Sequence, residues 1–212
     1  YAVSKEAGEW LKEYVKNGGT VVATYLTAYV NENTLAYLGG FPGAGLGEVF
    51  GLYAEELDTL YPTDSNAVLM KDGNKALVKD YCELIKLTGA EVLGTYESDF
   101  YAGMTAVAKN RFGKGTVYYV GTDLSESGLA KVLAMAADGA AIQPVIGEAT
   151  ALEITKRQAD GEDLYFIINF KDEEIPLPVV FDGKEDILTG EKVQGGEMLK
   201  KYDLRIVSVP RA

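Results

Sequence analysis

Apolar positions near the start of the chain repeat with a helical period and then run without interruption, the pattern of a crossover helix followed by a buried strand. Gly18 and Gly19 end the predicted helix, and Ser4 precedes it as an N-cap. Residues 20–25 are rich in β-branched side chains and lack polar alternation, which is typical of a strand covered on both faces of a parallel sheet. The apolar helical face comprises Ala7, Trp10, Leu11, Tyr14 and Val15.

The residues before this helix are too few for a strand. A parallel neighbour reached through a helix normally precedes that helix, but only Tyr1, Ala2 and Val3 stand there. We therefore expect an α/β domain that is truncated at its N-terminus.

The passage 26–60 is long, glycine-rich and aromatic. It is too long for a simple connection and too apolar to be disordered, so we expect short helical turns within it. Its aromatic residues could stack on a sugar, but we expect them to pack against the sheet or a partner subunit, because aromatic side chains bring large contact areas. The candidate subunit-interface residues are Tyr29, Tyr37, Phe41, Phe50 and Tyr53.

The rest of the first half alternates strands and helices. We expect strands at 67–70, 91–96, 105–109 and 116–120, a turn at Asp72-Gly73, and a loop over 99–103. Gly113 and Gly115 suit the positive φ of an antiparallel hairpin turn. A second helix is predicted from Leu77, Tyr81, Leu84 and Ile85 and ends at Gly89; a last helix is predicted from Leu129, Val132, Leu133 and Ala136 and ends at Gly139.

From about residue 142 the pattern changes to short strands without helices. The expected strands are 152–156, 164–170, 175–180, 185–188 and 204–209, with hairpin turns at Asp160-Gly161 and Asp182-Gly183. We therefore divide the chain into an α/β domain at 1–145 and an all-β domain at 146–212. The second is small enough that we expect it to dock against the first.

Composition narrows the classes of partner and chemistry. The net charge of −12 disfavours nucleic acid and anionic membranes as partners. The sequence lacks both a membrane-length apolar run and signal-peptide order, so we expect a cytoplasmic protein. The chain has one cysteine, Cys82, and no histidine, which excludes Cys-His and Ser-His nucleophiles and histidine-containing zinc sites. We expect no cofactor and no metal.

Three stretches together resemble the β-galactosidases of glycoside hydrolase family 42. They read LKEYVKNGGTVVATYLTAYVNENTLAYLGG, GEVFGLYAEELDTL and DFYAGMTAVAKNRFGKGTVYYVGTDL, and they occur in the family's order. The resemblance implies a class I glutamine amidotransferase-like (flavodoxin-like) domain with a mostly parallel sheet, N-terminally truncated, followed by a small all-β domain. In that family the amidotransferase-like domain mediates trimer formation, and a separate (β/α)8 barrel with two catalytic glutamates hydrolyses β-D-galactosides with retention.

No catalytic residue is predicted in this sequence. The barrel and its glutamates have no counterpart here, and the adjacent Glu55 and Glu56 diverge if their segment is extended. The acidic run 172–174 is expected to be a solvated turn. Cys82 lies in a predicted helix without a base, which favours a buried structural thiol over an amidotransferase nucleophile. The GAGLGE stretch fails as a dinucleotide fingerprint because Glu48 stands where the third glycine belongs.

Two functions remain open from the sequence. The resemblance implies a non-catalytic oligomerisation and scaffold region of a β-galactosidase, with further copies of the same enzyme as partners in a homotrimer. The alternative is a free-standing carbohydrate-binding or regulatory amidotransferase-like module without catalysis.

Overall fold

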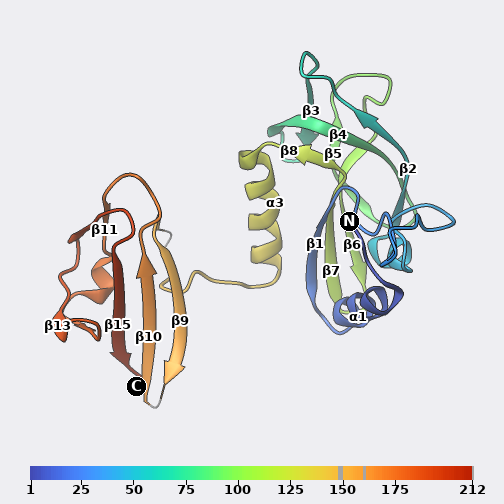
Figure 1. Ribbon diagram of the computed structural model, residues 1–212. Coiled ribbons are helices and arrows are strands. Elements are labelled where there is room, and N and C mark those ends of the chain that lie inside the picture. The colour runs from blue at the N-terminus through green and yellow to red at the C-terminus, as the bar shows by residue number, and fades with distance from the viewer. Residues whose placement is uncertain (148–149, 160, 212) are drawn as a thin grey trace. The chain divides into compact units, whose positions relative to one another are not determined.

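A strongly bent, mixed sheet runs through Tyr1–Ile142, the first of two units into which the chain divides (Figure 1). The computed structural model describes residues 1–147, 150–159 and 161–211. Across the sheet the strand order is β1-β7-β6-β5-β3-β4-β2, and β8 pairs with β4. β4 also pairs with β6, through Ile85 and Thr105, so strands β6, β5, β3 and β4 form a closed ring of pairings. The strands are β1 (Thr20–Thr24), β2 (Leu52–Thr59), β3 (Asn66–Met70), β4 (Lys75–Leu87), β5 (Glu91–Tyr96), β6 (Thr105–Phe112), β7 (Gly115–Val120) and β8 (Thr122–Leu124).

The expectation of a mostly parallel sheet is wrong. Strands β1 and β7 run parallel, with Val21 opposite Val117, whereas every other strand pairing within the described ranges is antiparallel. Short turns at Asp72-Gly73 and at Gly113 join β3 to β4 and β6 to β7, and such short connections impose antiparallel pairing. The parallel neighbour of β1 follows it in the chain.

The predicted second helix is also wrong, because its residues lie in β4. A spacing of four residues is a multiple of two, so Leu77, Tyr81 and Ile85 share one face of a strand as readily as one face of a helix. Residues 82–85 are all buried, since Leu84 packs into one hydrophobic core of the unit and Ile85 into the other. This double coverage removed the polar alternation by which a strand is recognised.

Helices cover both faces of the β1-β7 region, as the uninterrupted apolar run of β1 predicted. Helices α1 (Lys5–Lys16) and α2 (Leu46–Phe50) share a core with Val117 and Tyr119. On the opposite face α3 (Glu126–Gly139) shares a core with Tyr118 and Val120, and it lies beside β1 in Figure 1. No helix within the described residues is long and apolar enough to cross a membrane.

The limits of α1 are confirmed, but its predicted apolar face is partly wrong. The Ser4 side chain accepts a hydrogen bond from the Ala7 amide at 3.1 Å and caps the helix. Val15 is fully buried, whereas Trp10 and Tyr14 are 65% and 43% exposed and stack on each other. The packed side of α1 is centred on Gly8 and Val15, so the aromatic pair lies beside the contact with the sheet.

Gly115 serves a different purpose from the one expected. Gly113 has a φ of +60°, as the hairpin requires, but Gly115 is not in the left-handed region. A Cβ at Gly115 would lie 2.1 Å from the Val15 carbonyl oxygen. The glycine is needed there for the close approach of α1 to the sheet.

The second unit, Gln143–Ala212, is all-β. One sheet has the order β13-β12-β15-β10-β9, and a smaller one pairs β11 with β14. Its core contains Leu152, Ile167, Leu177, Phe181, Val193, Leu199 and Val207. The strands are β9 (Glu153–Ala159), β10 (Glu162–Ile168), β11 (Ile175–Pro176), β12 (Glu185–Asp186), β13 (Glu191–Lys192), β14 (Met198–Leu199) and β15 (Leu204–Pro210).

Two details of this unit correct the prediction. The strand expected at 175–180 ends at Pro176, and Val179–Phe181 forms a 3-10 helix, because the prolines at 176 and 178 cannot donate to a ladder. Asp182-Gly183 is not a hairpin turn, since β11 and β12 do not pair with each other. Asp160 of the other predicted turn lies outside the described residues.

Candidate functional site

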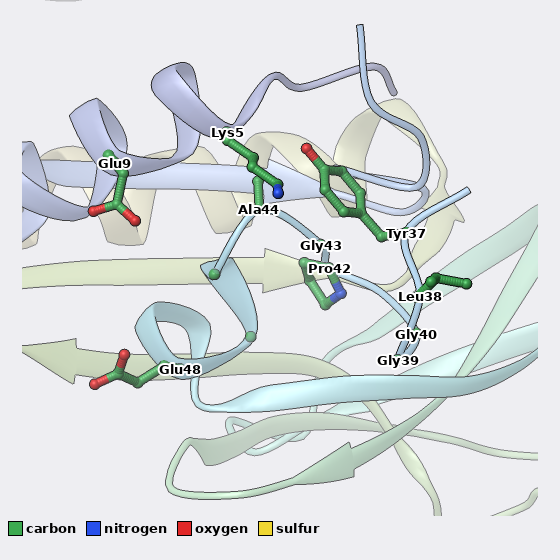
Figure 2. A pocket seen from close by; sticks show the side chains of 12 residues that line it. Lys5, Glu9, Tyr37, Leu38, Gly39, Gly40, Pro42, Gly43, Ala44 and Glu48 are labelled. Atoms are coloured by element: carbon green, nitrogen blue, oxygen red, sulfur yellow. The ribbon is translucent and has the colours of Figure 1, made fainter. Parts of the chain in front are cut away.

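A hollow of about 480 Å³ lies between the first half of α1 and the glycine-rich stretch that leads to α2 (Figure 2). Helix α1 contributes Lys5 and Glu9, and α2 contributes Glu48. The opposite wall comes from the loop, with Tyr37 and Leu38. We refer to the hollow as the groove and to residues 29–45 as the groove segment.

Two glycines allow the groove segment to lie against α1. A Cβ at Gly8 would be 2.4 Å from the Ala44 carbonyl oxygen, and a Cβ at Gly43 would be 2.0 Å from the Tyr37 ring. The Tyr37 hydroxyl donates a 2.7 Å hydrogen bond to the Val3 carbonyl. These contacts leave no space for a side chain at either glycine, so the wall of the groove is set by backbone packing.

Charged side chains of both signs surround the groove. Lys12 of α1 forms a 2.8 Å ion pair with Glu48 of α2, and the hydrogen bond to Glu48 raises the pKa of Lys12. Figure 2 shows the carboxylates of Glu9 and Glu48 at the same end of the groove, with Lys5 further along it. Exposed ion pairs of this kind contribute little to the stability of the fold. Their main effect is on the selectivity for a binding partner.

The five aromatic candidates lie in four different environments. Phe50 is 2% exposed and its ring lies 5.7 Å from that of Tyr119, so it belongs to the core and has no surface for a partner. Tyr29 and Phe41 are half-buried against each other, with ring centroids 4.8 Å apart. Tyr53 is 44% exposed on β2, and Tyr37 lines the groove.

Leucine residues are the part of the groove segment that the sequence prediction missed. Leu38 is fully exposed and Leu35 is 64% exposed, and Leu38 points away from Lys5 in Figure 2. Gly39 and Gly40 follow with φ values of +97° and +92° and with open space around them. The sequence signal for an exposed apolar site here is a pair of leucines just before the glycine pair, next to larger aromatic residues on which the prediction rested.

A buried carboxylate in the first unit was also missed. Glu83 of β4 has no exposed surface, and its Oε1 and Oε2 accept hydrogen bonds from the Leu26 amide at 2.7 Å and the Tyr119 hydroxyl at 2.8 Å. Burial raises the pKa of Glu83 to about 7, against the lowering effect of these two donors. Its sequence signal is a glutamate inside the apolar run YCELI.

The acidic residues that the sequence analysis considered lie at the surface. Glu55 and Glu56 are exposed on β2, and Glu55 pairs with Lys86 at 3.3 Å. Asp172 forms an ion pair with Lys201 on the surface of the second unit. In the part of the chain that the structure describes, no group of three or more metal-binding side chains comes together.

Cys82 is buried in β4, not in a helix as predicted. Its Sγ lies 3.9 Å from the Thr122 hydroxyl oxygen, and burial raises the pKa of its thiol. A buried thiol with a raised pKa is a poor nucleophile, so the structural role expected for Cys82 fits its surroundings.

Models of two protein domains match the chain. The β-galactosidase trimerisation domain matches residues 1–143, and the β-galactosidase C-terminal domain matches residues 151–208. Beta-galactosidase LacA of Lactobacillus acidophilus is 40% identical over 208 residues, covering 98% of this chain. Beta-galactosidase Pbg of Clostridium perfringens is 38% identical over 215 residues, again covering 98%.

Solved structures agree with these matches. The E323A catalytic mutant of Gan42B, a GH42 β-galactosidase from G. stearothermophilus, superposes with a TM-score of 0.85 at 40% identity over 100% of this chain. The β-galactosidase of Bacillus circulans sp. alkalophilus gives a TM-score of 0.87 at 29% identity. The chain spans 31% of the length of each of these four relatives. With both of its units matched, the chain belongs to the family of GH42 β-galactosidases, to their trimerisation and C-terminal domains.

Proposed function

We propose that this chain is the non-catalytic assembly region of a β-galactosidase, and that its groove segment forms a contact between subunits. The parent polypeptide would carry the retaining hydrolysis of terminal β-D-galactosides in a barrel outside this sequence, and copies of the parent would associate as a homotrimer. The observation that best supports a subunit contact at the groove segment is the full exposure of Leu38.

Three features support a protein partner at the groove segment. Leu35 and Leu38 are exposed on a loop, whose backbone is fixed beside them by the packing of Gly43 on Tyr37. Apolar side chains on a pre-organised surface lose little entropy when a partner covers them. The trimerisation domain whose model matches residues 1–143 is named for self-association.

The absence of catalysis from this chain is supported by its chemistry. It has no histidine, Glu83 is closed off from solvent, and within the described ranges no group of three or more His, Cys, Asp or Glu side chains comes together. We expect purified chain to leave a chromogenic galactoside uncleaved, whereas the parent polypeptide hydrolyses it.

The contact is tested with Leu38→Asp in the parent polypeptide. A charge on a side chain covered by a partner weakens association, and one well-buried anchor is worth about 2 kcal/mol or more, roughly thirtyfold in the dissociation constant. Light scattering over a dilution series should therefore show dissociation of this variant. The same substitution in the 212-residue chain should leave its melting temperature unchanged, because Leu38 makes no internal contact to lose.

Val179→Asp is the matched control, since Val179 is an exposed aliphatic residue of the second unit. It should keep the oligomeric mass of the parent. A Leu38→Asp parent that stays at its full mass at every dilution would remove the groove segment as a subunit contact.

We further propose that the first unit is an amidotransferase-like, flavodoxin-like domain in which β1 gains a second parallel neighbour in the parent polypeptide. β1 lies at one end of the described sheet and pairs with β7 along one edge. The exposed Trp10-Tyr14 stack lies on the helix that precedes this strand. A further strand with its crossover would cover both features in the manner of a parallel α/β sheet.

A further inference from the structure

The buried carboxylate of Glu83 lies next to an unusual turn at the end of β1. Leu26 and Ala28 have φ values of +59° and +55°, in the left-handed region that residues with a Cβ adopt at a cost. Such a conformation persists only where neighbouring contacts impose it. The Leu26 amide donates to Glu83 Oε1 at 2.7 Å, so the carboxylate is one of the groups that hold the turn.

The same turn supports the groove segment. The Ala28 carbonyl accepts a 2.9 Å hydrogen bond from the Gly43 amide, and the Tyr29 amide donates to the Tyr1 carbonyl at 3.1 Å. Gly43 in turn packs against Tyr37, which lines the groove. Two hydrogen bonds, the backbone of the turn between them and the packing of Gly43 on Tyr37 therefore connect Glu83 in the core to the groove.

We propose that Glu83 is a proton-sensitive latch: its ionised carboxylate holds the turn at residues 26–28, and protonation loosens the groove segment that the turn supports. Both carboxylate oxygens of the ionised form act as acceptors, one for Leu26 and one for Tyr119. Charge-assisted hydrogen bonds are roughly twice as strong as neutral ones. Once protonated, the carboxyl offers Leu26 an ordinary neutral bond, and its hydroxyl competes with that of Tyr119.

Among the titratable groups around Glu83, only the Glu83 carboxyl changes its charge near neutral pH. The Tyr119 hydroxyl of β7 donates to the Glu83 carboxylate, the Tyr96 hydroxyl of β5 donates to the Glu83 backbone carbonyl, and Cys82 is the neighbour of Glu83 in β4. Burial raises the pKa of both phenols and of the thiol, so all three stay neutral there. Burial likewise raises the pKa of Tyr25, which precedes the turn. No ion pair among the described residues includes Glu83, while burial brings its own pKa to about 7.

The effect on assembly rests on the proposed function, because the groove segment is the proposed subunit contact. An ordered segment loses less entropy on association, so the ionised latch favours assembly. Association of the parent polypeptide should therefore strengthen as the pH rises through about 7.

The latch is tested by NMR on the 212-residue chain between about pH 5 and about pH 9, a range that brackets the titration of Glu83. The side-chain carboxyl carbon of Glu83 and the amide of Leu26 should shift together in one step with a midpoint near 7. Protection of the Leu26 amide against hydrogen exchange, corrected for the intrinsic pH dependence, should rise roughly fivefold to tenfold over that step.

Three variants separate the latch from a general effect of pH. Glu83→Gln keeps an acceptor for Leu26 without a charge, and should show no step and low-pH protection throughout. Glu56→Gln removes an exposed carboxyl from β2 and should behave as the unaltered chain. Tyr119→Phe removes the hydroxyl donor that lowers the pKa of Glu83, so its step should remain but move to higher pH; this variant keeps the test decisive if Glu83→Gln does not fold.

A Glu83 carboxyl that titrates while the Leu26 amide keeps its shift and protection would overturn the latch. So would a carboxyl that does not change state over the range. If the NMR step is present but the oligomeric mass of the parent is independent of pH and insensitive to Leu38→Asp, the latch stands and the proposed subunit contact fails.

Discussion

At the scale of residues, Glu83 combines a cost in stability with a role in local order. Its carboxylate has hydrogen-bond donors on both oxygens but is fully buried and lacks a paired cation among the described residues. Hydrogen bonds offset only part of the cost of burying a charge. The first unit is therefore destabilised by the ionised form even as that form tightens the Leu26 turn.

This balance predicts how stability depends on pH. Because the pKa of Glu83 is raised from 4.5 to about 7 in the folded chain, its stabilising contribution is complete below pH 4.5 and is lost as the pH rises to about 7. Glu83→Gln should remove this loss and raise the free energy of unfolding above pH 7 by at most about 3 kcal/mol. Urea unfolding at several pH values measures it. Equal pH dependence in both proteins would contradict the prediction.

Features that depend on a residue and its near neighbours in sequence could be predicted, whereas features that depend on distant segments could not. The Ser4 cap, the turn at Gly113 and the burial of Cys82 follow from local chemistry and were predicted. The contacts of Gly8 and Gly43 and the carboxylate of Glu83 depend on segments distant in the chain. A sequence pattern has no direct record of such pairings, so these features became visible only in the fold.

At the scale of elements, α3 was predictable from local sequence, whereas β4 depends on segments that are distant in the chain. Helix α3 was predicted because its apolar spacing and the closing Gly139 have no equally good strand interpretation. β4 was mistaken for a helix because its residues 82–85 are buried on both faces, and because the strands that pair with it come from before and after it in the chain. Tertiary pairing, not local propensity, made it a strand.

The outer edge of β1 gives an element-scale prediction. If β1 gains a parallel neighbour in the parent polypeptide, its outward amides become hydrogen-bonded and exchange more slowly. Hydrogen exchange with mass spectrometry should show peptides covering Thr20–Thr24 better protected in the parent than in the 212-residue chain. Peptides covering β7, which is paired on both sides here, serve as the control and should be alike in both. Equal protection of β1 would count against the added strand.

At the scale of the whole molecule, the two units differ in how much stability each can lose before it unfolds. The core of the second unit is small, and the polar residue Asn169 of this unit is fully buried. The Asn169 side chain donates to the carbonyls of Glu173 and Leu199, each at 2.8 Å, and accepts from the Lys171 amide. One amide therefore joins three segments of the unit.

Asn169→Ala should accordingly unfold the second unit selectively. Leaving the buried Leu199 carbonyl without its donor costs about 1–3 kcal/mol, a large part of the stability of a small domain, and the two partly buried bonds to Glu173 and Lys171 are lost with it. In an NMR spectrum the indole signal of Trp10, the single tryptophan of the chain, should keep its position while signals of the second unit collapse. Gln194→Ala, at an exposed position, is the control and should leave both units folded. Loss of the Trp10 signal in Asn169→Ala would show that the units unfold together.

The parallel pairing of β1 with β7 also has a consequence for synthesis. Thr20 pairs with Thr116, so the apolar strand β1 leaves the ribosome long before the partner that it has in the described sheet. At translation rates of 5–20 residues per second, β1 waits roughly 5 to 20 s for β7. During that interval Val21, Val22 and Ala23 lack their β7 partners, and this open strand edge makes the nascent chain a target for chaperones that bind extended apolar segments.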